Sequence, residues 1–327
     1  MRILVTGAAG MIGRKLAERL ARDRAVGAEP IDRLVLVDIV GPVMDAPPGL
    51  EIETVSADVS EPGVADILIG SRPDLVFHLA AVVSGEAEAD FEKGYDVNVD
   101  GMRHLLEAIR SAGQMYCPRF VFASSIAVFG SPFPDVIPDD FCAAPLTSYG
   151  TQKAIGELLL CDYSRRGFLD GVGIRLPTIT VRPGAPNRAA SGFFSGIIRE
   201  PLDGRDAVLP VPDDIRHWHA SPRAAIAFLL HAATLDTGVL GQRRCLTMPG
   251  VSVTVAAQIE ALRRVAGDDA VRLIRREPDE TVLAIVDGWP REFDPGRALS
   301  LGFRAESSFD EIVRVYIEDE LEGQAAR

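Results

Sequence analysis

Residues 3–13 read Ile-Leu-Val-Thr-Gly-Ala-Ala-Gly-Met-Ile-Gly, an apolar run followed by a loop with three evenly spaced glycines. The apolar run predicts a buried strand, and the residues from Met11 to about Ala25 predict a helix. In such a loop one glycine permits the tight turn, a second lets a pyrophosphate approach the backbone, and a third packs helix on strand. The free N–H groups at the start of the helix also favour phosphate. We therefore expect cofactor contacts from Gly7, Gly10, Met11, Ile12 and Gly13.

Three spaced glycines are equally compatible with an ordinary strand-to-helix turn, so the acidic residues that follow are needed to indicate a dinucleotide site. Asp38 ends a second apolar run, Leu34–Val37. A carboxylate there can bind both hydroxyls of an adenosine ribose and would repel a 2′-phosphate, which favours NAD over NADP. The alternative for Asp38 is a helix N-cap. Asp58, followed by Val59, is a candidate partner of the adenine amino group or a plain loop residue.

Short apolar runs alternate with helical patterns in the first half of the chain, which is typical of a parallel sheet covered by helices on both faces. Strands are predicted at 75–79 and 120–123, and a helix at about 98–112. We expect an α/β fold, a Rossmann-like doubly wound parallel sheet, with an NAD-binding domain over residues 1–180. Residues 181–327 are expected to form mainly a smaller C-terminal substrate-binding lobe, although the chain can re-enter the core. Helices are predicted again at 222–233, 253–265 and 309–320.

Small residues follow the predicted strand at 75–79. Alanines at this position allow a cofactor to lie close over the backbone, so Leu79, Ala80 and Ala81 join the expected NAD site. His78, inside the strand, is expected to be a histidine of the core.

Ser125, Tyr149 and Lys153 form the sharpest group of candidate catalytic residues. Thr147 or Ser148 can cap a helix, and Tyr149 and Lys153 project from one face of it because they lie four positions apart. A free tyrosine has a pKa of about 10 and is rarely ionised at neutral pH. A nearby Lys153 ammonium favours the phenolate, so Tyr149 can act as general base on a hydroxyl that Ser125 holds. Lys153 also reaches the nicotinamide ribose. The alternative is a surface Tyr–Lys pair, which the serine pair ending the preceding strand makes weaker.

Together these motifs resemble those of the extended short-chain dehydrogenases/reductases of the NAD-dependent epimerase/dehydratase type. The family's GxxGxxG matches the three glycines, and its YxxxK matches Tyr149 and Lys153. Its serine pattern S-x-x-V-[YF]-G matches residues 125–130. Asn98 resembles the family's structural and cofactor-side asparagine, and residues 293–303 resemble its late segment. The resemblance spans nearly the whole chain and implies NAD as the cofactor.

One segment departs from the pattern of the sugar epimerases, which usually carry an Asn and a Gly-Pro after the sixth strand. Here residues 175–184 read Arg-Leu-Pro-Thr-Ile-Thr-Val-Arg-Pro-Gly. This stretch and residues 187–196 are similar to a subgroup of sugar-acid dehydrogenases that oxidise C2 of a four-carbon acid. The resemblance implies oxidation of a 2-hydroxy acid to its 2-oxo acid. Pro177 and Thr178 are expected to contact the cofactor.

Arginines and hydroxyl groups supply the candidates for binding a sugar acid. A guanidinium matches a carboxylate with two parallel hydrogen bonds. For any single one of these residues, a surface position or a structural ion pair is an equally good interpretation. His217 and His219 are expected to pack and hydrogen-bond instead of catalysing. The candidates are Arg182, Arg188 and Arg216 for the carboxylate, and Ser84, Asn187 and Ser191 for hydroxyls, together with Ser125 and Tyr149.

Composition limits the partners. The 327 residues are 47% hydrophobic, with 34 Lys and Arg against 47 Asp and Glu, a formal net charge of −13. So acidic a chain is not expected to bind nucleic acid. Four scattered cysteines without a CxxC pair indicate neither a disulfide framework nor a metal site. With no signal-peptide pattern and no membrane-spanning run, we expect a cytoplasmic protein.

Three functions compete at this point. The preferred one is NAD-dependent oxidation of a sugar acid, with net formation of NADH. A nucleotide-sugar epimerase or dehydratase would use the same residues, hold its cofactor tightly and release no NADH. A non-catalytic NAD-sensing module would not need Ser125, Tyr149 and Lys153 together. The family's habit further implies a homodimer built on the helices near 98–112 and 149–165.

Overall fold

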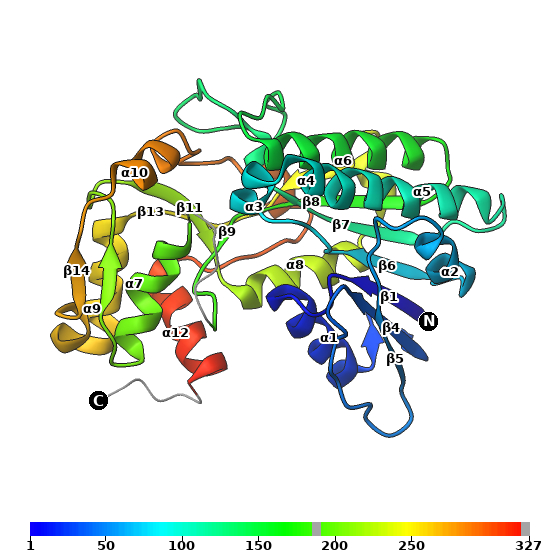
Figure 1. Ribbon diagram of the computed structural model, residues 1–327, viewed down its shortest axis with the longest axis horizontal. Coiled ribbons are helices and arrows are strands. Elements are labelled where there is room, and N and C mark those ends of the chain that lie inside the picture. Colours follow the sequence, from blue (N-terminus) through cyan, green and yellow to red (C-terminus); the bar gives the residue numbers. More distant parts are fainter. Residues whose placement is uncertain (185–190, 322–327) are drawn as a thin grey trace. The chain divides into compact units, whose positions relative to one another are not determined.

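The computed structural model describes residues 1–184 and 191–321 (Figure 1). The chain divides into two compact units, each made of three segments. Unit 1 contains residues 1–128, 147–175 and 226–246, and unit 2 contains residues 129–146, 176–225 and 247–327.

Unit 1 is built on a seven-stranded sheet. The strands are β1 (Arg2–Thr6), β4 (Arg33–Asp38), β5 (Glu51–Ser56), β6 (Leu75–His78), β7 (Arg119–Ser125), β8 (Asp170–Leu176) and β12 (Cys245–Thr247). Their order is β12-β8-β7-β6-β1-β4-β5. β1 pairs in parallel with both β4 and β6. From β1 the chain adds β4 and β5 on one side and then returns to add β6, β7 and β8 on the other, so the direction of strand order reverses at β1. This is the topology of a doubly wound sheet, and it confirms the predicted Rossmann-like fold.

Helices cover both faces of this sheet (Figure 1). One face carries α2 (Val64–Gly70), α5 (Gly101–Ser111) and α6 (Ser148–Arg165), and the other carries α1 (Met11–Asp23) and α8 (Pro222–Thr234). Alternate strand residues point to opposite faces. Leu4, Val76 and Phe120 accordingly join Leu105 and Leu106 of α5 in one buried cluster.

Local signals placed several helices correctly. The predicted helix after the glycine loop is α1, and the one predicted at 309–320 is α12 (Phe309–Glu320). Of the two candidate caps of α6, Thr147 is the one used, because its Oγ1 accepts a hydrogen bond from the Gly150 amide at 3.1 Å.

The helix predicted at about 98–112 begins earlier than expected. Asp90 caps α4 (Phe91–Tyr95) by accepting from the Lys93 amide at 3.1 Å, and a π-helical turn, Asp96–Asp100, leads directly into α5. The chain is therefore helical from Phe91 onward. Short elements complete unit 1: β2 (Ala25–Val26), β3 (Glu29–Pro30), α3 (Ser84–Ala89) and two 3-10 turns, Ile126–Val128 and Thr237–Leu240.

Unit 2 has two small sheets and its own core. Its strands are β9 (Thr178–Ile179), β10 (Ala207–Leu209), β11 (Arg216–Ala220), β13 (Val251–Thr254) and β14 (Ile274–Arg276). They form a sheet in the order β13-β11-β9 and a parallel β10-β14 pair. The helices are α7 (Gly192–Leu202), α9 (Val255–Val271), α10 (Glu280–Val286), α11 (Gly296–Ser300) and α12.

Helix α7 was not predicted. Gly192, Gly196 and Pro201 lower the helix propensity of its sequence. Phe194 and Ile198, spaced by four, nevertheless lie buried in the core of unit 2, which stabilises the helix. Within residues 1–184 and 191–321, no helix is long and apolar enough to span a membrane, and no cluster of His, Cys, Asp or Glu is suited to a metal ion.

Candidate active site

The cofactor residues predicted for unit 1 follow the carboxyl ends of its strands. Thr6 of β1 lies in register with Val37 of β4 and with His78 of β6. The glycine loop, Asp38 and Leu79 therefore leave the sheet at one edge, next to the point where the strand order reverses. Doubly wound folds bind their ligands at this position.

The glycine loop has the shape of a phosphate cradle. Gly7 has φ +75°, and a Cβ on it would lie 2.5 Å from the Ala80 nitrogen. A Cβ on Gly13 would lie 2.1 Å from the Gly7 carbonyl oxygen. On Gly10 a Cβ would meet only that same oxygen, at 3.3 Å, among the described atoms. The fold itself thus needs glycine at 7 and 13, whereas position 10 is left open to a ligand.

The start of α1 suits an anion. Gly10 is its N-cap, no side chain caps the helix, and its first turn contains no acidic residue. The N–H groups of Met11 and Ile12 have no partner within the helix, as in every first turn. Together with the open Gly10, this donor set fits the pyrophosphate of a dinucleotide.

Asp38 holds the glycine loop. Its Oδ2 accepts from the Ala9 amide at 2.9 Å and its Oδ1 accepts from the Ile39 amide at 2.8 Å. No helix begins after Asp38, because residues 39–50 contain none, so the alternative of an N-cap is wrong. Asp58 Oδ1 accepts from the Ser60 amide at 2.9 Å and from its hydroxyl at 2.6 Å, and Val59 is buried. Contact between Asp58 and adenine stays a prediction.

Asn98 supports the segment that follows β6. From the π-helical turn, its Oδ1 accepts from the Val82 amide at 2.8 Å and its Nδ2 donates to the Val82 carbonyl at 3.0 Å. Nδ2 also donates to Gln152 Oε1 at 2.7 Å. The amide of Leu79 donates to the carbonyl of Thr6 at 3.1 Å. Asn98 thus has the structural half of its predicted role.

His78 is a core histidine, as predicted. It is 1% exposed, its Nδ1 lies 2.8 Å from the Thr6 hydroxyl, and its ring stacks on Phe122. Burial, with a contribution from the charge of Lys153, lowers the pKa of His78 to about 3. The imidazole is therefore neutral at physiological pH.

Ser125, Tyr149 and Lys153 come from β7 and α6. Ser125 is the last residue of its strand, and its Oγ accepts from the Ala127 amide at 3.1 Å. The Lys153 ammonium donates to the Ala123 carbonyl at 2.9 Å and lies 5.7 Å from the centre of the Tyr149 ring. Lys153 thereby links the helix bearing Tyr149 to the strand that ends at Ser125. Burial lowers the pKa of Lys153 to about 8, so it is still mainly a cation at neutral pH.

In unit 2 the structure brings Arg182 and Ser191 together. The Arg182 guanidinium donates to the Ile179 carbonyl at 2.9 Å and to Ser191 Oγ at 2.6 Å, and Ser191 is 8% exposed. Arg216 is exposed on β11, with long contacts of 3.4 Å to Ser252. The remaining candidates are scattered: Ser84 begins α3, Pro177 is buried before β9, and Asn187 and Arg188 lie outside the described residues.

His217 and His219 pack in unit 2, as predicted. His217 Nδ1 lies 2.9 Å from the Pro290 carbonyl, which can only accept, so Nδ1 carries the proton. Its Nε2 must then accept from the Thr178 hydroxyl, 2.6 Å away. Burial lowers the pKa of His217 to about 4, and burial also lowers the pKa of His219. Both imidazoles are therefore neutral at physiological pH, both nitrogens of each ring are hydrogen-bonded, and the proton of Thr178 is committed to His217.

Sequence reasoning missed the polar residues that support the catalytic group. Ser124, Glu157 and Arg175 are all buried and joined by hydrogen bonds. A signal was present, because Glu157 lies four residues after Lys153 and so shares its helix face. A charged residue on the buried face of a helix requires a partner.

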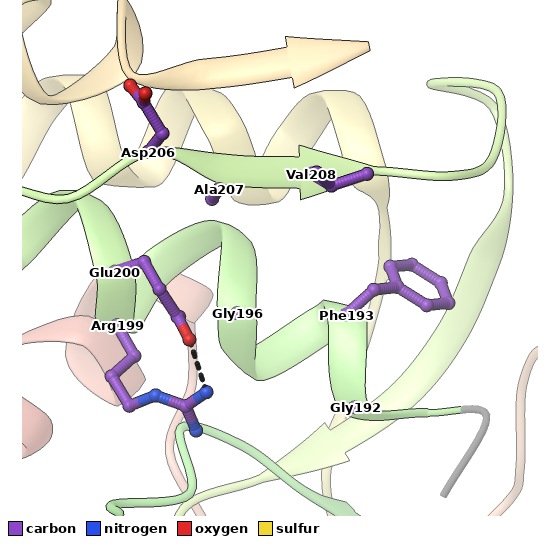
Figure 2. Close-up of a pocket in the computed structure, with 8 residues that line it drawn as sticks. All are labelled: Gly192, Phe193, Gly196, Arg199, Glu200, Asp206, Ala207 and Val208. Carbon is purple, nitrogen blue, oxygen red and sulfur yellow. Dashed lines mark hydrogen bonds and ion pairs between the residues drawn. The ribbon is translucent and has the colours of Figure 1, made fainter. Parts of the chain in front are cut away.

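A small pocket lies elsewhere in unit 2, between α7 and β10 (Figure 2). The ion pair of Arg199 with Glu200 lies at one end of it, and Phe193 at the other. None of the residues predicted for catalysis or for NAD lines this pocket, so it is not the candidate active site. Its lining consists of Gly192, Phe193, Gly196, Arg199, Glu200, Asp206, Ala207 and Val208.

Comparison with known proteins gives consistent matches along the chain. The profile of the NAD dependent epimerase/dehydratase family matches residues 3–238. The chain is 49% identical to a D-erythronate dehydrogenase of Cupriavidus necator, over 98% of each chain. It is 41% identical to a D-erythronate dehydrogenase of Haemophilus influenzae, over 97% of this chain and 99% of that protein.

Solved structures agree on the fold. A crystal structure described as a nucleoside-diphosphate-sugar epimerase of Agrobacterium tumefaciens is 59% identical, with a TM-score of 0.97 over 99% of this chain and 95% of that one. An L-threonine dehydrogenase of Cupriavidus necator is 24% identical, with a TM-score of 0.82 over 98% of this chain and 99% of that one. The second likeness concerns the fold alone.

Proposed function

The chain belongs to the NAD dependent epimerase/dehydratase family, and we propose that it oxidises D-erythronate at C2 to 2-oxo-tetronate. It is an NAD-dependent dehydrogenase of the short-chain dehydrogenase/reductase type. The observation that carries the choice of substrate is the 49% identity to a D-erythronate dehydrogenase over nearly the full length of both chains.

The cofactor occupies unit 1 in this proposal. The open face of Gly10 and the start of α1 bind the pyrophosphate, and Asp38 binds the adenosine ribose. When bound there, NAD would supply the acceptor for the hydride that leaves C2 of the acid. The further candidates for contacts with the cofactor are Asp58, Leu79–Ala81, Asn98, Pro177 and Thr178.

The proton chemistry belongs to three side chains. Tyr149, as phenolate, takes the proton of the C2 hydroxyl while Ser125 holds the same oxygen. The desolvated Lys153 ammonium favours the phenolate and binds the nicotinamide ribose. Anchoring of Lys153 to the Ala123 carbonyl keeps the charge in place beside the Tyr149 ring. Correct placement of hydride donor and acceptor supplies most of the rate enhancement.

The acid's carboxylate binds Arg182 in this proposal. Two hydrogen bonds to Ile179 and Ser191 hold the guanidinium in one orientation, which reduces the entropy lost when it binds an anion. The Thr178 hydroxyl donates to His217, so towards a ligand it can only accept. Arg188, Arg216, Asn187, Ser191 and Ser84 are the further candidates for carboxylate and hydroxyl contacts.

The test is NADH absorbance during incubation with NAD and a panel of free sugar acids, headed by D-erythronate. We expect stoichiometric NADH and 2-oxo-tetronate from D-erythronate, and less activity with its C2 epimer. The proposal fails if no acid in the panel yields NADH while the protein is folded and binds NAD.

A second candidate is a nucleotide-sugar epimerase, which the description of the 59% identical Agrobacterium tumefaciens structure favours. It would use the same residues in oxidation and then in reduction of one substrate. Interconversion of a UDP-sugar without accumulation of NADH identifies this activity, so one set of assays separates the two.

We also propose a cytoplasmic homodimer. None of the four cysteines forms a disulfide, which suits a reducing compartment. Helices α5 and α6 lie side by side (Figure 1), and Leu158 on α6 is 72% exposed. A single exposed leucine is ordinary on a protein surface, so the dimer is proposed from the habit of the family and Leu158 provides a position at which to test it. Light scattering coupled to gel filtration tests the dimer, and Leu158→Glu is expected to yield monomers.

A further inference from the structure

A buried polar network lies directly behind the strand end that bears Ser125. Ser124 donates its hydroxyl proton to Glu157 Oε1 at 2.6 Å. Arg175 donates through Nε to Oε1 at 2.9 Å and through its terminal nitrogen to Oε2 at 2.8 Å. Ser124, Glu157 and Arg175 are 2%, 6% and 9% exposed, so water does not compete for these bonds. The network joins α6 to β7 and β8.

Two contacts between α6 and β7 lie one helical turn apart. Lys153 and Glu157 are four residues apart and project from the same face of the helix, on the stripe that begins with Tyr149. They bind successive residues of the strand, Lys153 the carbonyl of Ala123 and Glu157 the hydroxyl of Ser124. These two hydrogen bonds, one helical turn apart, together set the rotation of α6 about its axis and its position along β7.

The same interface is tightly packed. A Cβ on Gly156 would lie 2.8 Å from the Phe122 ring and 3.0 Å from the Met102 sulfur. The helix therefore lies close to the sheet at this point. This close approach limits the distance between helix and sheet, but apolar packing is non-directional and by itself leaves the helix some freedom of position along the strand. The directional bonds of Glu157 remove that freedom.

A buried ion pair is a poor source of stability, because desolvation offsets its attraction, but it is well suited to specify geometry. We infer that Glu157 is a positioning residue that, through Ser124, sets the alignment of Tyr149 and Lys153 with Ser125. The inference rests on the proposed roles of those three residues in catalysis. Errors of about 1 Å in such an alignment cost on the order of 100-fold in rate.

The test changes Ser124 and leaves the ion pair intact. Replacing Glu157 would leave Arg175 as a buried charge without its ion-pair partner, so Glu157→Gln is the variant at risk of not folding. Ser124→Ala removes one hydroxyl and keeps Glu157 paired with Arg175. Ser124→Thr retains the hydroxyl and serves as the conservative rescue.

Ser164→Ala is the matched control. Ser164 of α6 is also buried, at 7% exposed, and links the helix to β8. Its Oγ donates to the Leu160 carbonyl at 2.6 Å and accepts from the Gly171 amide at 3.2 Å. It anchors the far end of the helix. If the hydrogen bond between Ser124 and Glu157 is purely structural, Ser124→Ala and Ser164→Ala should lower Tm by similar amounts and have the same kcat.

We expect Ser124→Ala to lower kcat roughly 10- to 100-fold, with the Kd for NAD within about twofold of wild type. Ser164→Ala is expected to keep wild-type kcat, and Ser124→Thr to recover most of the loss. Equal kcat in the two alanine variants would overturn the inference.

A second readout needs no substrate. The ionisation of Tyr149 can be followed by ultraviolet difference titration of the NAD complex. The chain has five tyrosines, and the titration curve of Tyr149→Phe, subtracted from that of wild type, removes the signal of the other four. Ser124→Ala is expected to shift the Tyr149 transition to higher pH, because Lys153 loses its alignment, and Ser164→Ala is not. If no sugar acid is oxidised, the proposed substrate fails, and this titration still decides the role of Glu157. An unchanged transition in Ser124→Ala would reject it.

Discussion

The carboxylate of Asp38 accepts a hydrogen bond from the backbone amide of Ala9, with 2.9 Å between Oδ2 and the nitrogen. The side chain proposed to bind the adenosine ribose therefore also ties the glycine loop to the end of β4. Both duties need a hydrogen-bond acceptor, whereas a third, repulsion of the 2′-phosphate of NADP, needs the negative charge.

Asp38→Asn separates these duties. The amide oxygen can still accept from Ala9, so the loop keeps its anchor, while the charge that repels a 2′-phosphate is gone. We expect the preference for NAD over NADP, measured as the ratio of kcat/KM values, to fall at least roughly tenfold. An unchanged ratio in a folded variant would show that Asp38 does not select the cofactor.

Replacing Gly13 or Gly10 of the loop with alanine should have different consequences, a loss of stability in the first case and a loss of NAD affinity in the second. A Cβ at Gly13 meets the Gly7 carbonyl at 2.1 Å, so Gly13→Ala is expected to lower the free energy of unfolding by roughly 1–3 kcal/mol. Gly10→Ala meets only one atom at 3.3 Å and is expected to fold normally, yet to bind NAD at least about tenfold more weakly. Urea unfolding without cofactor, and NAD titration by fluorescence, measure the two effects. Normal NAD affinity in Gly10→Ala would contradict the assigned cradle.

Tyr149→Phe tests the proposed base. The ring remains beside Lys153, so the packing of α6 is preserved, but no phenolate can form. We expect kcat to fall by about 10²–10⁴-fold with little change in NAD affinity. Turnover close to that of wild type would assign the proton transfer to another group.

Arg182 is expected to recognise the carboxylate of the substrate. Arg182→Met removes a charge-assisted pair of hydrogen bonds and should raise KM for the acid by about 10- to 100-fold. The uncharged amide of the same acid provides the control, because the variant should no longer distinguish it from the free acid. Arg216→Met, which changes an exposed side chain with only long contacts, offers a matched comparison. If Arg216→Met alone raises KM, the two arginines exchange roles.

Buried histidines make the fold sensitive to acid. The folded state holds the pKa of His78 at about 3, below the ordinary histidine value of 6.5, so protonation favours the unfolded chain. The stability contributed by neutral His78 is complete above about pH 6.5 and is lost as the pH falls towards 3. Between pH 7 and 5 this amounts to about 2 kcal/mol.

Urea unfolding of wild type and His78→Asn at the two pH values measures this contribution. Asn can still bond to the Thr6 hydroxyl but does not titrate, so the variant is expected to lose about 2 kcal/mol less on acidification. Parallel losses in the two proteins would mean that His78 is not buried as a neutral base.

The parts of unit 1 that sequence could predict are those with local causes. The apolar run before Gly7, a cap at Thr147 or Ser148 and the four-residue spacing of Tyr149 and Lys153 each act within a few residues, and the structure has the corresponding strand and helices there. Burial in the sheet then adds to a preference that the segment already has.

Features that depend on distant contacts escaped prediction. Helix α7 has poor propensity and is stabilised by the core in which Phe194 lies. The acceptor of Lys153 is a backbone carbonyl, which no residue type reveals, and the partner of Ser124 lies 33 residues along the chain. The π-helical turn that carries Asn98 likewise continues directly from α4. The N-cap of α4, Asp90, precedes the start predicted at about residue 98.

The outer strand of the unit 1 sheet has a consequence for synthesis of the protein. β12 pairs with β8 and is contributed by Cys245–Thr247, and the Gly173 amide donates to the Arg244 carbonyl at 2.9 Å. While the intervening residues 177–244 are being translated, β8 has no neighbour on that side. The nascent chain therefore exposes the edge of β8, the kind of surface that pairs with other chains, until residue 247 has left the ribosome and β12 can cover it.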